Sequence, residues 1–141
     1  MLSITYISTA LKKLSNDELV TLLATWRSCN LRFDITGLLL YKAGSFIQTI
    51  EGPEASILRL YDNIKHDPLH TNVVTVLQES IQERHFIHWS MGFQLVDKLP
   101  KDIGPGFNAL LSDPQMAETF AQSPHRIDKL HWMFREIASR A

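Results

Sequence analysis

The amino-acid sequence predicts one α+β domain, a ferredoxin-like sheet of four or five strands with two helices on one face. Segments with strand alternation and segments with helical apolar spacing follow one another in the order β-α-β-β-α-β-β. No low-complexity tract or long linker divides the 141 residues, so no second large domain is expected. We expect residues 1–97 to form the domain. Residues 98–141 are expected to add C-terminal helices that pack on the sheet, in preference to forming a dimer seam.

The first half of the domain is expected to contain three strands and one helix. Alternating apolar positions predict a strand at residues 1–8. Ser15 and Glu18 have the spacing of a capping box and precede an apolar-periodic run, which predicts the start of a helix. The elements expected after the first strand are this helix at residues 16–28 and a hairpin of strands at residues 37–41 and 45–50.

The second half is expected to contain one helix and two strands. A Pro in the first turn and a helical apolar stripe predict a helix that starts at Gly52-Pro53-Glu54 and ends at Asp67-Pro68. β-Branched residues predict a strand at residues 73–77, and strict alternation predicts another at residues 88–95. Beyond Pro105 the chain is expected to be helical.

Composition and charge exclude several classes of protein. Apolar residues make up 45% of the chain, which is enough for a packed core. The formal net charge of -1 gives no footprint for nucleic acid or an anionic membrane. The single cysteine, Cys29, excludes an internal disulfide and a cysteine-based zinc site. Because no apolar run approaches the ~20 residues of a membrane span and no export signal is present, we expect a cytoplasmic protein.

Three polar residues fall where the periodicity requires apolar ones. Tyr6 continues the apolar face of the first strand, Gln48 interrupts that of the third, and Asn30 extends the inward stripe of the first helix. A buried polar group without a partner costs ~1–3 kcal/mol, so these side chains are expected to be hydrogen-bonded. Each also has a structural explanation, since core tyrosines are common, Asn suits helix ends and a buried Gln can bond to backbone. The spacing favours a ligand pocket between sheet and helices, with a structural polar network as the alternative.

Motifs for catalysis or metal binding are weak. His66 and His70 flank Asp67, but His66 is expected to face away at a helix end, so no metal site is expected. The sequence has no nucleophile elbow, P-loop or GxGxxG motif. We therefore expect no enzyme. The alternatives are a small dimeric ferredoxin-like enzyme with His70 as its acid–base group, or a ligand-binding module.

Five motifs occur in a fixed order along these elements: Ile4-Thr5-Tyr6-Ile7-Ser8, Arg27-Ser28-Cys29-Asn30 with Ile35-Thr36-Gly37-Leu38-Leu39-Leu40-Tyr41, Phe46-Ile47-Gln48-Thr49-Ile50-Glu51-Gly52-Pro53, Asp67-Pro68-Leu69-His70 and Trp89-Ser90-Met91-Gly92-Phe93. Together they resemble a BLUF domain, the blue-light sensor that uses flavin adenine dinucleotide (FAD). The resemblance covers about residues 1–97. Its most specific parts are Asn30 spaced ahead of residues 35–37 and Gln48 spaced ahead of residues 51–52.

The resemblance implies a role for each of several residues. Tyr6 would donate an electron to the excited flavin, and Gln48 would lie between Tyr6 and the ring and hydrogen-bond both. Asn30 would hold the carbonyl and imide edge of the flavin. Trp89 and Met91 would be switch residues on the last strand. Further cofactor contacts are expected from Arg27, Lys65, Asp67 and His70, and an apolar slot for the ring from Ile4, Leu22, Leu39 and Phe46.

Two positions depart from the family's pattern. Cys29 stands where the family often has His or Asn, and Leu69 stands where it commonly has Arg. Either change is expected to alter flavin affinity or dark recovery without touching the polar trio. Since residues 98–141 are too few for an output domain, the resemblance implies a homo-oligomer that signals to a separate downstream protein.

Overall fold

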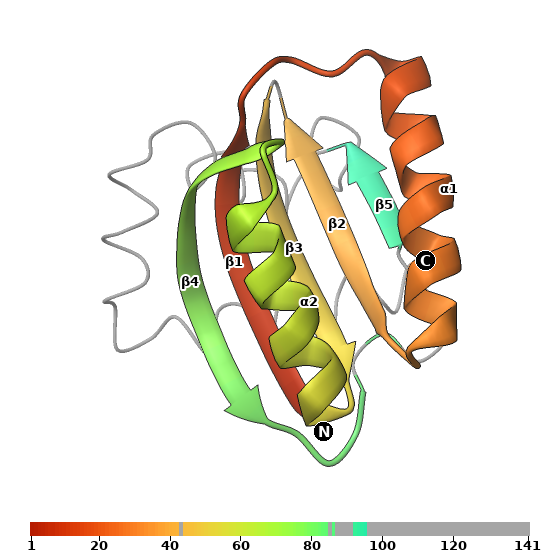
Figure 1. Cartoon of the computed structure of the whole chain (residues 1–141), viewed down its shortest axis with the longest axis vertical. Helices are drawn as coiled ribbons and strands as arrows, with labels where there is room; N and C mark the ends of the chain where they lie inside the picture. Colours follow the sequence, from red (N-terminus) through yellow and green to blue (C-terminus); the bar gives the residue numbers. More distant parts are fainter. Residues whose placement is uncertain (43, 85, 87–91, 96–141) are drawn as a thin grey trace, which may run out of the picture.

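The computed structural model describes residues 1–42, 44–84, 86 and 92–95, which form a five-stranded sheet and two helices (Figure 1). The strands are β1 (Leu2–Ala10), β2 (Thr36–Lys42), β3 (Ser45–Gly52), β4 (His70–Ser80) and β5 (Gly92–Leu95). The helices are α1 (Asn16–Arg32) and α2 (Glu54–His66). The element order is the predicted one, and the ferredoxin-like α+β class is confirmed.

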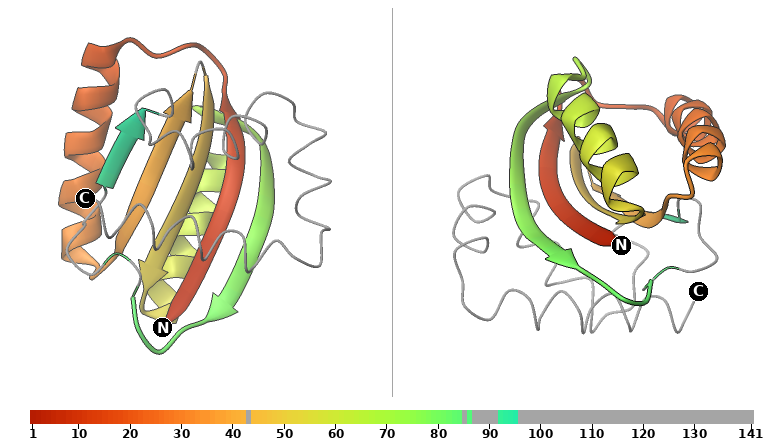
Figure 2. Two further views of the ribbon diagram at one scale, coloured as in Figure 1. Left: turned by 180° about the vertical axis from the view of Figure 1, so that it is seen from behind. Right: turned by 60° about the horizontal axis from the view of Figure 1, so that its bottom comes forward.

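The strand order in the sheet is β4-β1-β3-β2-β5. β1 lies between β4 and β3 and is antiparallel to both, and β2 is antiparallel to β3. β5 pairs parallel with β2 at the opposite edge from β4. Both helices lie on the same face of this sheet, as predicted (Figure 2).

α1 begins where the sequence predicts and ends about one turn later. Ser15 Oγ accepts from the Glu18 N–H at 3.2 Å, and the Glu18 carboxylate accepts from the Ser15 N–H at 3.2 Å, so the capping box is formed. The helix continues to Arg32 and is followed by Asp34 in the left-handed region, with φ 58°. The added turn carries the exposed Leu31, so the apolar periodicity does not extend to it.

β4 is longer than the apolar pattern predicts, because residues 73–77 are only the middle of it. The whole strand pairs with β1, from Ala10 opposite His70 to Leu2 opposite Ser80. Its polar ends become strand because β1 offers backbone donors and acceptors there. This pairing is long-range, so local alternation in the sequence does not predict it. Of the predicted strand at residues 88–95, β5 accounts for 92–95. Residues 88–91 and the predicted C-terminal helices lie outside the described residues.

Gly37 allows two strands to approach closely in the core. An added Cβ at Gly37 would lie 2.0 Å from the Thr49 carbonyl oxygen, which no real side chain tolerates. The apolar core packs between this sheet and the helices, and Ile4, Phe46 and Ile57 are fully buried in it. The glycine of the Ile35-Thr36-Gly37 motif is therefore a packing requirement of the β2–β3 pair.

One register row crosses the middle of the sheet and carries two of the predicted site residues. Tyr6 on β1 lies directly opposite Gln48 on β3, and Gln48 lies opposite Leu39 on β2. Leu39 is in turn opposite Phe93 on β5. Directly opposed residues share a face of the sheet, so the row sets Tyr6, Gln48 and Leu39 on the face that the helices cover.

Candidate functional site

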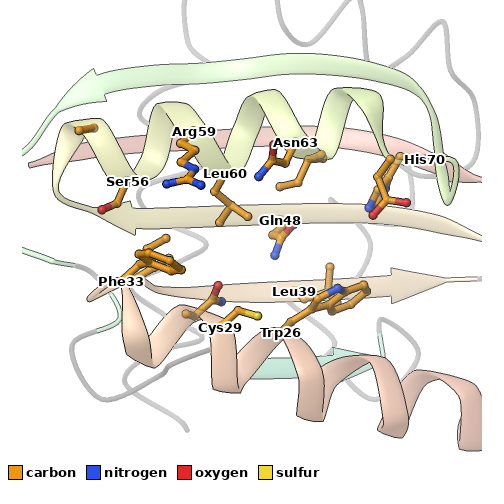
Figure 3. A pocket seen from close by; sticks show the side chains of 15 residues that line it. Trp26, Cys29, Phe33, Leu39, Gln48, Ser56, Arg59, Leu60, Asn63 and His70 are labelled. Carbon is orange, nitrogen blue, oxygen red and sulfur yellow. The ribbon is translucent and has the colours of Figure 1, made fainter.

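A cavity of about 430 Å³ lies between α1 and α2, over β2 and β3 (Figure 3). The residues that line it are Trp26, Cys29, Asn30, Phe33, Ile35, Leu39, Gln48, Ala55, Ser56, Arg59, Leu60, Asn63, Ile64, Asp67 and His70. Its volume falls within the range of roughly 300–1,000 Å³ that small-molecule sites occupy.

The cavity has a buried floor and an exposed mouth. On the floor, Leu39 is 1% exposed, Asn30 4% and Gln48 7%. At the mouth, Phe33 is 47% exposed and Arg59 is exposed as well. An apolar floor with two buried amides suits a flat, mostly apolar ring that has one polar edge, and this is the shape and polarity of an isoalloxazine ring. The residues present therefore fit a flavin.

Tyr6 lies behind Gln48 and is fully buried. Its hydroxyl donates a hydrogen bond to Oε1 of Gln48. Figure 3 shows the Gln48 side chain projecting from β3 into the cavity, with its amide nitrogen directed toward α1. Gln48 thus connects a buried phenol on one side with the cavity on the other.

The surroundings of Tyr6 keep its phenol protonated. Burial raises the pKa of Tyr6 far above its ordinary value, and the neighbouring Tyr61 and Asp67 raise it further. The Tyr61 ring lies 5.5 Å from the Tyr6 ring, centroid to centroid, and its own hydroxyl is 2.5 Å from Thr75 Oγ1. At neutral pH the Tyr6 hydroxyl is therefore a hydrogen-bond donor, and Gln48 is the acceptor that it meets.

His70 forms the lining next to this pair, together with Asp67. Nδ1 of His70 is 2.9 Å from Ser8 Oγ, and its ring centroid is 6.1 Å from that of Tyr6. Burial lowers the pKa of His70, and the charge of Asp67 opposes this shift in part. The neutral imidazole is favoured at pH 7. The Asp67 carboxylate accepts from the Leu69 N–H at 2.9 Å and brings a negative charge to this end of the cavity.

Asn30 lies in the last turn of α1, with its side chain buried in the cavity floor. Its backbone oxygen accepts from the N–H groups of Phe33 at 3.2 Å and Ile35 at 2.9 Å, which turns the chain from α1 into β2. The alternative that Asn30 caps the helix is wrong, because α1 continues to Arg32 and Phe33 is the C-cap residue.

The structure brings the predicted trio together, since Tyr6 bonds to Gln48 while Gln48 and Asn30 line one cavity. Within the described residues, every buried side-chain nitrogen and oxygen has a hydrogen-bond partner. The polar network is therefore satisfied by the protein itself. The evidence for a ligand site here is therefore the cavity beside the network, and not an unsatisfied polar group.

The other predicted contacts are distributed differently. Asp67 and His70 line the cavity, whereas Arg27 and Lys65 are exposed and do not. The Lys65 ammonium lies 4.5 Å from the centroid of the Tyr61 ring. The predicted switch residues are outside the described part of the chain, so the roles of Trp89 and Met91 stay predictions.

Of the four residues predicted to form the apolar slot, one lines the cavity. Leu39 lines the cavity, whereas Ile4 and Phe46 are fully buried in the core and do not reach it. Leu22 lines a separate hollow beside Leu14, because it lies on the flank of α1 that faces the β1–α1 connection. The aromatic and apolar walls come instead from Trp26, Phe33, Ile35, Leu60 and Ile64.

Sequence reasoning missed three polar residues of α2 that line the cavity. Ser56, Arg59 and Asn63 have the i, i+3, i+7 spacing of a single helix face. This stripe runs beside the apolar stripe of Ile57 and Tyr61. The spacing is visible in the sequence, but polar residues beside an apolar stripe are also typical of a solvated helix flank.

The described residues contain no group of three or more His, Cys, Asp or Glu side chains that could hold a metal ion. His66 points back along α2, where Nδ1 of its ring lies 2.8 Å from the Asp62 carbonyl oxygen. Neither of the two described helices is long and apolar enough to span a membrane.

Residues 1–92 match the BLUF family, described as sensors of blue-light using FAD. The chain is 42% identical over 90 residues to photoactivated adenylate cyclase subunit beta of Euglena longa, which covers 63% of this chain and 10% of that protein. It is 37% identical over 68 residues to the blue light- and temperature-regulated antirepressor BluF of Escherichia coli (strain K12), covering 48% of this chain and 16% of that protein.

A solved structure gives the same result over a greater length. The dark state structure of BlrB, a BLUF protein, is 30% identical with a TM-score of 0.72, and the match covers 99% of this chain and 96% of that one. The chain spans about a tenth of the length of the Euglena relative. Since the family match covers most of the described domain, the chain belongs to the BLUF family of blue-light sensors.

Proposed function

We propose that this chain is a blue-light photoreceptor that holds FAD between α1 and α2, with Tyr6 and Gln48 as its photochemical switch. One observation carries the proposal: the Tyr6 hydroxyl donates to Oε1 of a glutamine whose side chain lines the floor of the cavity. A ring seated on that floor would be separated from the phenol by a single amide. The family match supports a flavin as the ring, and FAD is the form in the family's description.

The chain's own residues would hold and orient the ring. Asn30 and Gln48 place two amides on an otherwise apolar floor, where they can bond to the carbonyl and imide groups of a flavin edge. Leu39 below the ring and Trp26 and Leu60 at its sides would exclude water from the Tyr6–Gln48 hydrogen bond. His70, which is neutral at pH 7, would add a polar wall without adding charge.

When bound, the flavin supplies an excited state that accepts an electron after absorbing blue light. Tyr6 would give that electron, which is supported by its full burial and by its hydrogen bond to Gln48, a residue that lines the cavity. Loss of an electron makes the phenol strongly acidic, so its proton would pass to Oε1 of Gln48 along the existing hydrogen bond. Tyr6 would recover its electron and its proton before the cycle ends, so that the chain undergoes no net oxidation.

Gln48 would be left altered by this cycle. The oxygen and nitrogen ends of an amide are nearly equal in size, so rotation or tautomerisation exchanges donor for acceptor with little change of shape. The hydrogen bond that Gln48 offers to the ring would then differ between the dark and lit states. Such a change can bias a nearby two-state element through differential contacts.

The structural change at Gln48 would be transmitted through β5, the strand at the end of the register row. Leu39, next to Gln48 in that row, is opposite Phe93 of β5, which lies in the same segment as the predicted switch residues Trp89 and Met91. We infer that the signal passes to a separate protein, which is supported by the name of the Escherichia coli relative, an antirepressor, and that the chain acts as a homo-oligomer. The chain itself is proposed to have no catalytic turnover.

The absorption spectrum before and after illumination tests the function directly. Purified full-length protein should be yellow, and blue light should shift its flavin absorption reversibly to longer wavelength. A colourless protein that takes up no flavin on reconstitution would overturn the proposal. Flavin that binds but shows no reversible shift would reject the sensor function and leave only a flavin-binding module.

Two pairs of matched variants test the switch. Tyr6→Phe removes one hydroxyl, and we expect flavin to bind while the light-induced shift disappears. Tyr61→Phe is the control, because it removes a hydroxyl that bonds to Thr75 and not to Gln48, and it should keep the shift. Gln48→Leu should likewise abolish the shift, and the same change at the exposed Gln78 of β4 should not. A normal shift in Tyr6→Phe or Gln48→Leu would refute the assigned roles.

A further inference from the structure

A pair of threonine hydroxyls lies behind the Tyr6–Gln48 pair, on the other face of the sheet. Thr5 precedes Tyr6 on β1, and Thr49 follows Gln48 on β3. Because successive side chains of a strand point to opposite faces, the two threonines point away from the helices. Thr5 Oγ1 and Thr49 Oγ1 are 2.7 Å apart, so one hydroxyl donates to the other. Side-chain hydrogen bonds thus join β1 to β3 on both faces, in adjacent rows of one ladder.

The row that contains the threonines is otherwise apolar. Thr5 has Leu77 of β4 on its other side, and Thr49 has Leu38 of β2. All four side chains are buried, with Thr5 0% and Thr49 1% exposed. Valine has nearly the shape of threonine and suits a buried strand, so packing alone does not require hydroxyl groups here. What the hydroxyls add is a directional bond, in surroundings of low dielectric where hydrogen bonds are strengthened.

This bond lies where the other ladder of β1 is irregular. The β1–β3 register is continuous across residues 2–9. The β1–β4 register, in contrast, shifts between Thr5 and Tyr6 and again between Ile7 and Thr9. Irregular pairing leaves a ladder locally disrupted, so β4 holds this part of β1 less firmly. The position of Tyr6 is therefore set from the β3 side of the strand.

Thr49 is itself fixed from its other side by β2. A Cβ added at Gly37 would lie 2.0 Å from the Thr49 carbonyl oxygen, so the β2 backbone lies directly against Thr49. Thr49 has no room to move toward β2. It is therefore a firm support from which the hydroxyl bond can hold Thr5 and the strand that carries it.

We propose that Thr5 and Thr49 are positioning residues for the light-driven switch. Their hydrogen bond holds the backbones of β1 and β3 at a fixed separation, one residue away from Tyr6 and Gln48. The phenol therefore stays within bonding distance of the amide before and after illumination. The inference rests on the proposed photoreceptor function and deepens it, because it assigns a role in the switch to two residues that do not line the cavity.

Matched variants of the full-length, flavin-loaded protein test this role. Thr5→Val combined with Thr49→Val replaces both hydroxyls by methyl groups of similar shape, which should leave stability nearly unchanged. We expect the light-induced shift to remain but dark recovery to become about threefold to tenfold faster, as loss of one buried hydrogen bond allows. The fluorescence decay of the bound flavin should also slow, because Tyr6, its proposed electron donor, is held less closely. Thr5→Ser combined with Thr49→Ser keeps both hydroxyls and should restore both values.

The single variants show whether the two threonines act through one bond. Thr5→Val and Thr49→Val each break the same hydrogen bond, so they should change dark recovery alike, and the double variant should change it no more than either. Effects of the single variants that add in the double variant would contradict a shared bond. If the double variant does not retain flavin, the two single variants decide by the same two measurements.

Ser3→Ala is the control for loss of a buried hydroxyl. Ser3 is 2% exposed on the same face of β1, but it lies opposite Glu51 and not beside the switch. The change should alter neither dark recovery nor fluorescence decay. The positioning role is overturned if both values stay unchanged in the double valine variant, or if Ser3→Ala changes them equally.

The outcomes also separate this role from the photoreceptor function. If the unaltered chain shows the reversible shift and Tyr6→Phe abolishes it, while the valine variants behave like the unaltered chain, only the positioning role is wrong. If the unaltered chain shows no reversible shift, the proposed function fails, and the positioning role fails with it.

Discussion

Replacing Gly37 by alanine should damage the fold more than the same change at Gly44 or Gly52. The new Cβ would lie 2.0 Å from the Thr49 carbonyl oxygen, whereas ordinary contact begins at 3.4 Å, a shortfall of 1.4 Å. The obstructing atom is backbone in the central strand β3, so β2 itself would have to move away. Such a shift breaks hydrogen bonds between β2 and β3 and loosens Leu39 on the cavity floor. We expect a loss of roughly 3–5 kcal/mol from a total stability of order 5–15 kcal/mol.

Equilibrium urea unfolding of the full-length chain, followed by far-UV circular dichroism, measures this loss. Gly44→Ala is the matched control, because its Cβ would meet only the Lys13 side chain at 3.7 Å and the cost comes from the backbone, with φ at 93°. That strain is worth roughly 1–2 kcal/mol. If Gly37→Ala is no less stable than Gly44→Ala, the close approach of β2 to β3 is not as described and the reasoning fails.

Two further predictions concern the hydrogen bonds of Arg84, which we call the Arg84 clamp, and the protonation of His70. Arg84→Met should cost about 2–3 kcal/mol in urea unfolding, because the guanidinium donates to Thr36 Oγ1 and to the carbonyl oxygens of Asp34 and Glu51. Asp34→Asn, which removes only an ion pair with an exposed carboxylate, should cost less than about 1 kcal/mol, and equal losses would contradict the clamp. The melting temperature should fall as pH drops below 6.5, the ordinary pKa of histidine, because the folded pKa of His70 is lowered and the unfolded chain binds the proton first. His70→Gln should flatten this slope, and an unchanged slope would assign the effect to other groups.

Much of the fold could be predicted from local pattern. The capping box predicts the first residue of α1, alternation predicts β1, and the hairpin turn predicts β2 and β3. Long-range pairing explains the main error of extent, since the polar ends of β4 become strand through β1. The end of α1 was missed because it carries an exposed Leu31 and is set by the left-handed Asp34, and neither leaves a periodic signal.

The site was predictable where it depends on polar residues within apolar patterns. Tyr6, Asn30 and Gln48 stood out because each interrupts or extends an inward face, and the sheet register then joins two of them. Arg59 and Asn63 did not stand out, because charged and amide side chains on a helix flank are ordinary surface residues. Only the placement of α1 beside α2 turns that flank into a cavity wall. The packing angle between helices is a tertiary property, and no local pattern encodes it.

The opposition of Tyr6 and Gln48 in the β1–β3 ladder has a consequence for how the molecule matures. A slip of one residue between these strands would send one partner to the far side of the sheet, since successive side chains alternate. The phenol–amide pair is therefore a by-product of correct strand alignment. Misaligned chains would lack the pair and the polar floor together, so they would also fail to hold the pigment. The ratio of flavin absorbance to protein absorbance in a purified sample would then measure the fraction of molecules in which β1 and β3 are correctly aligned.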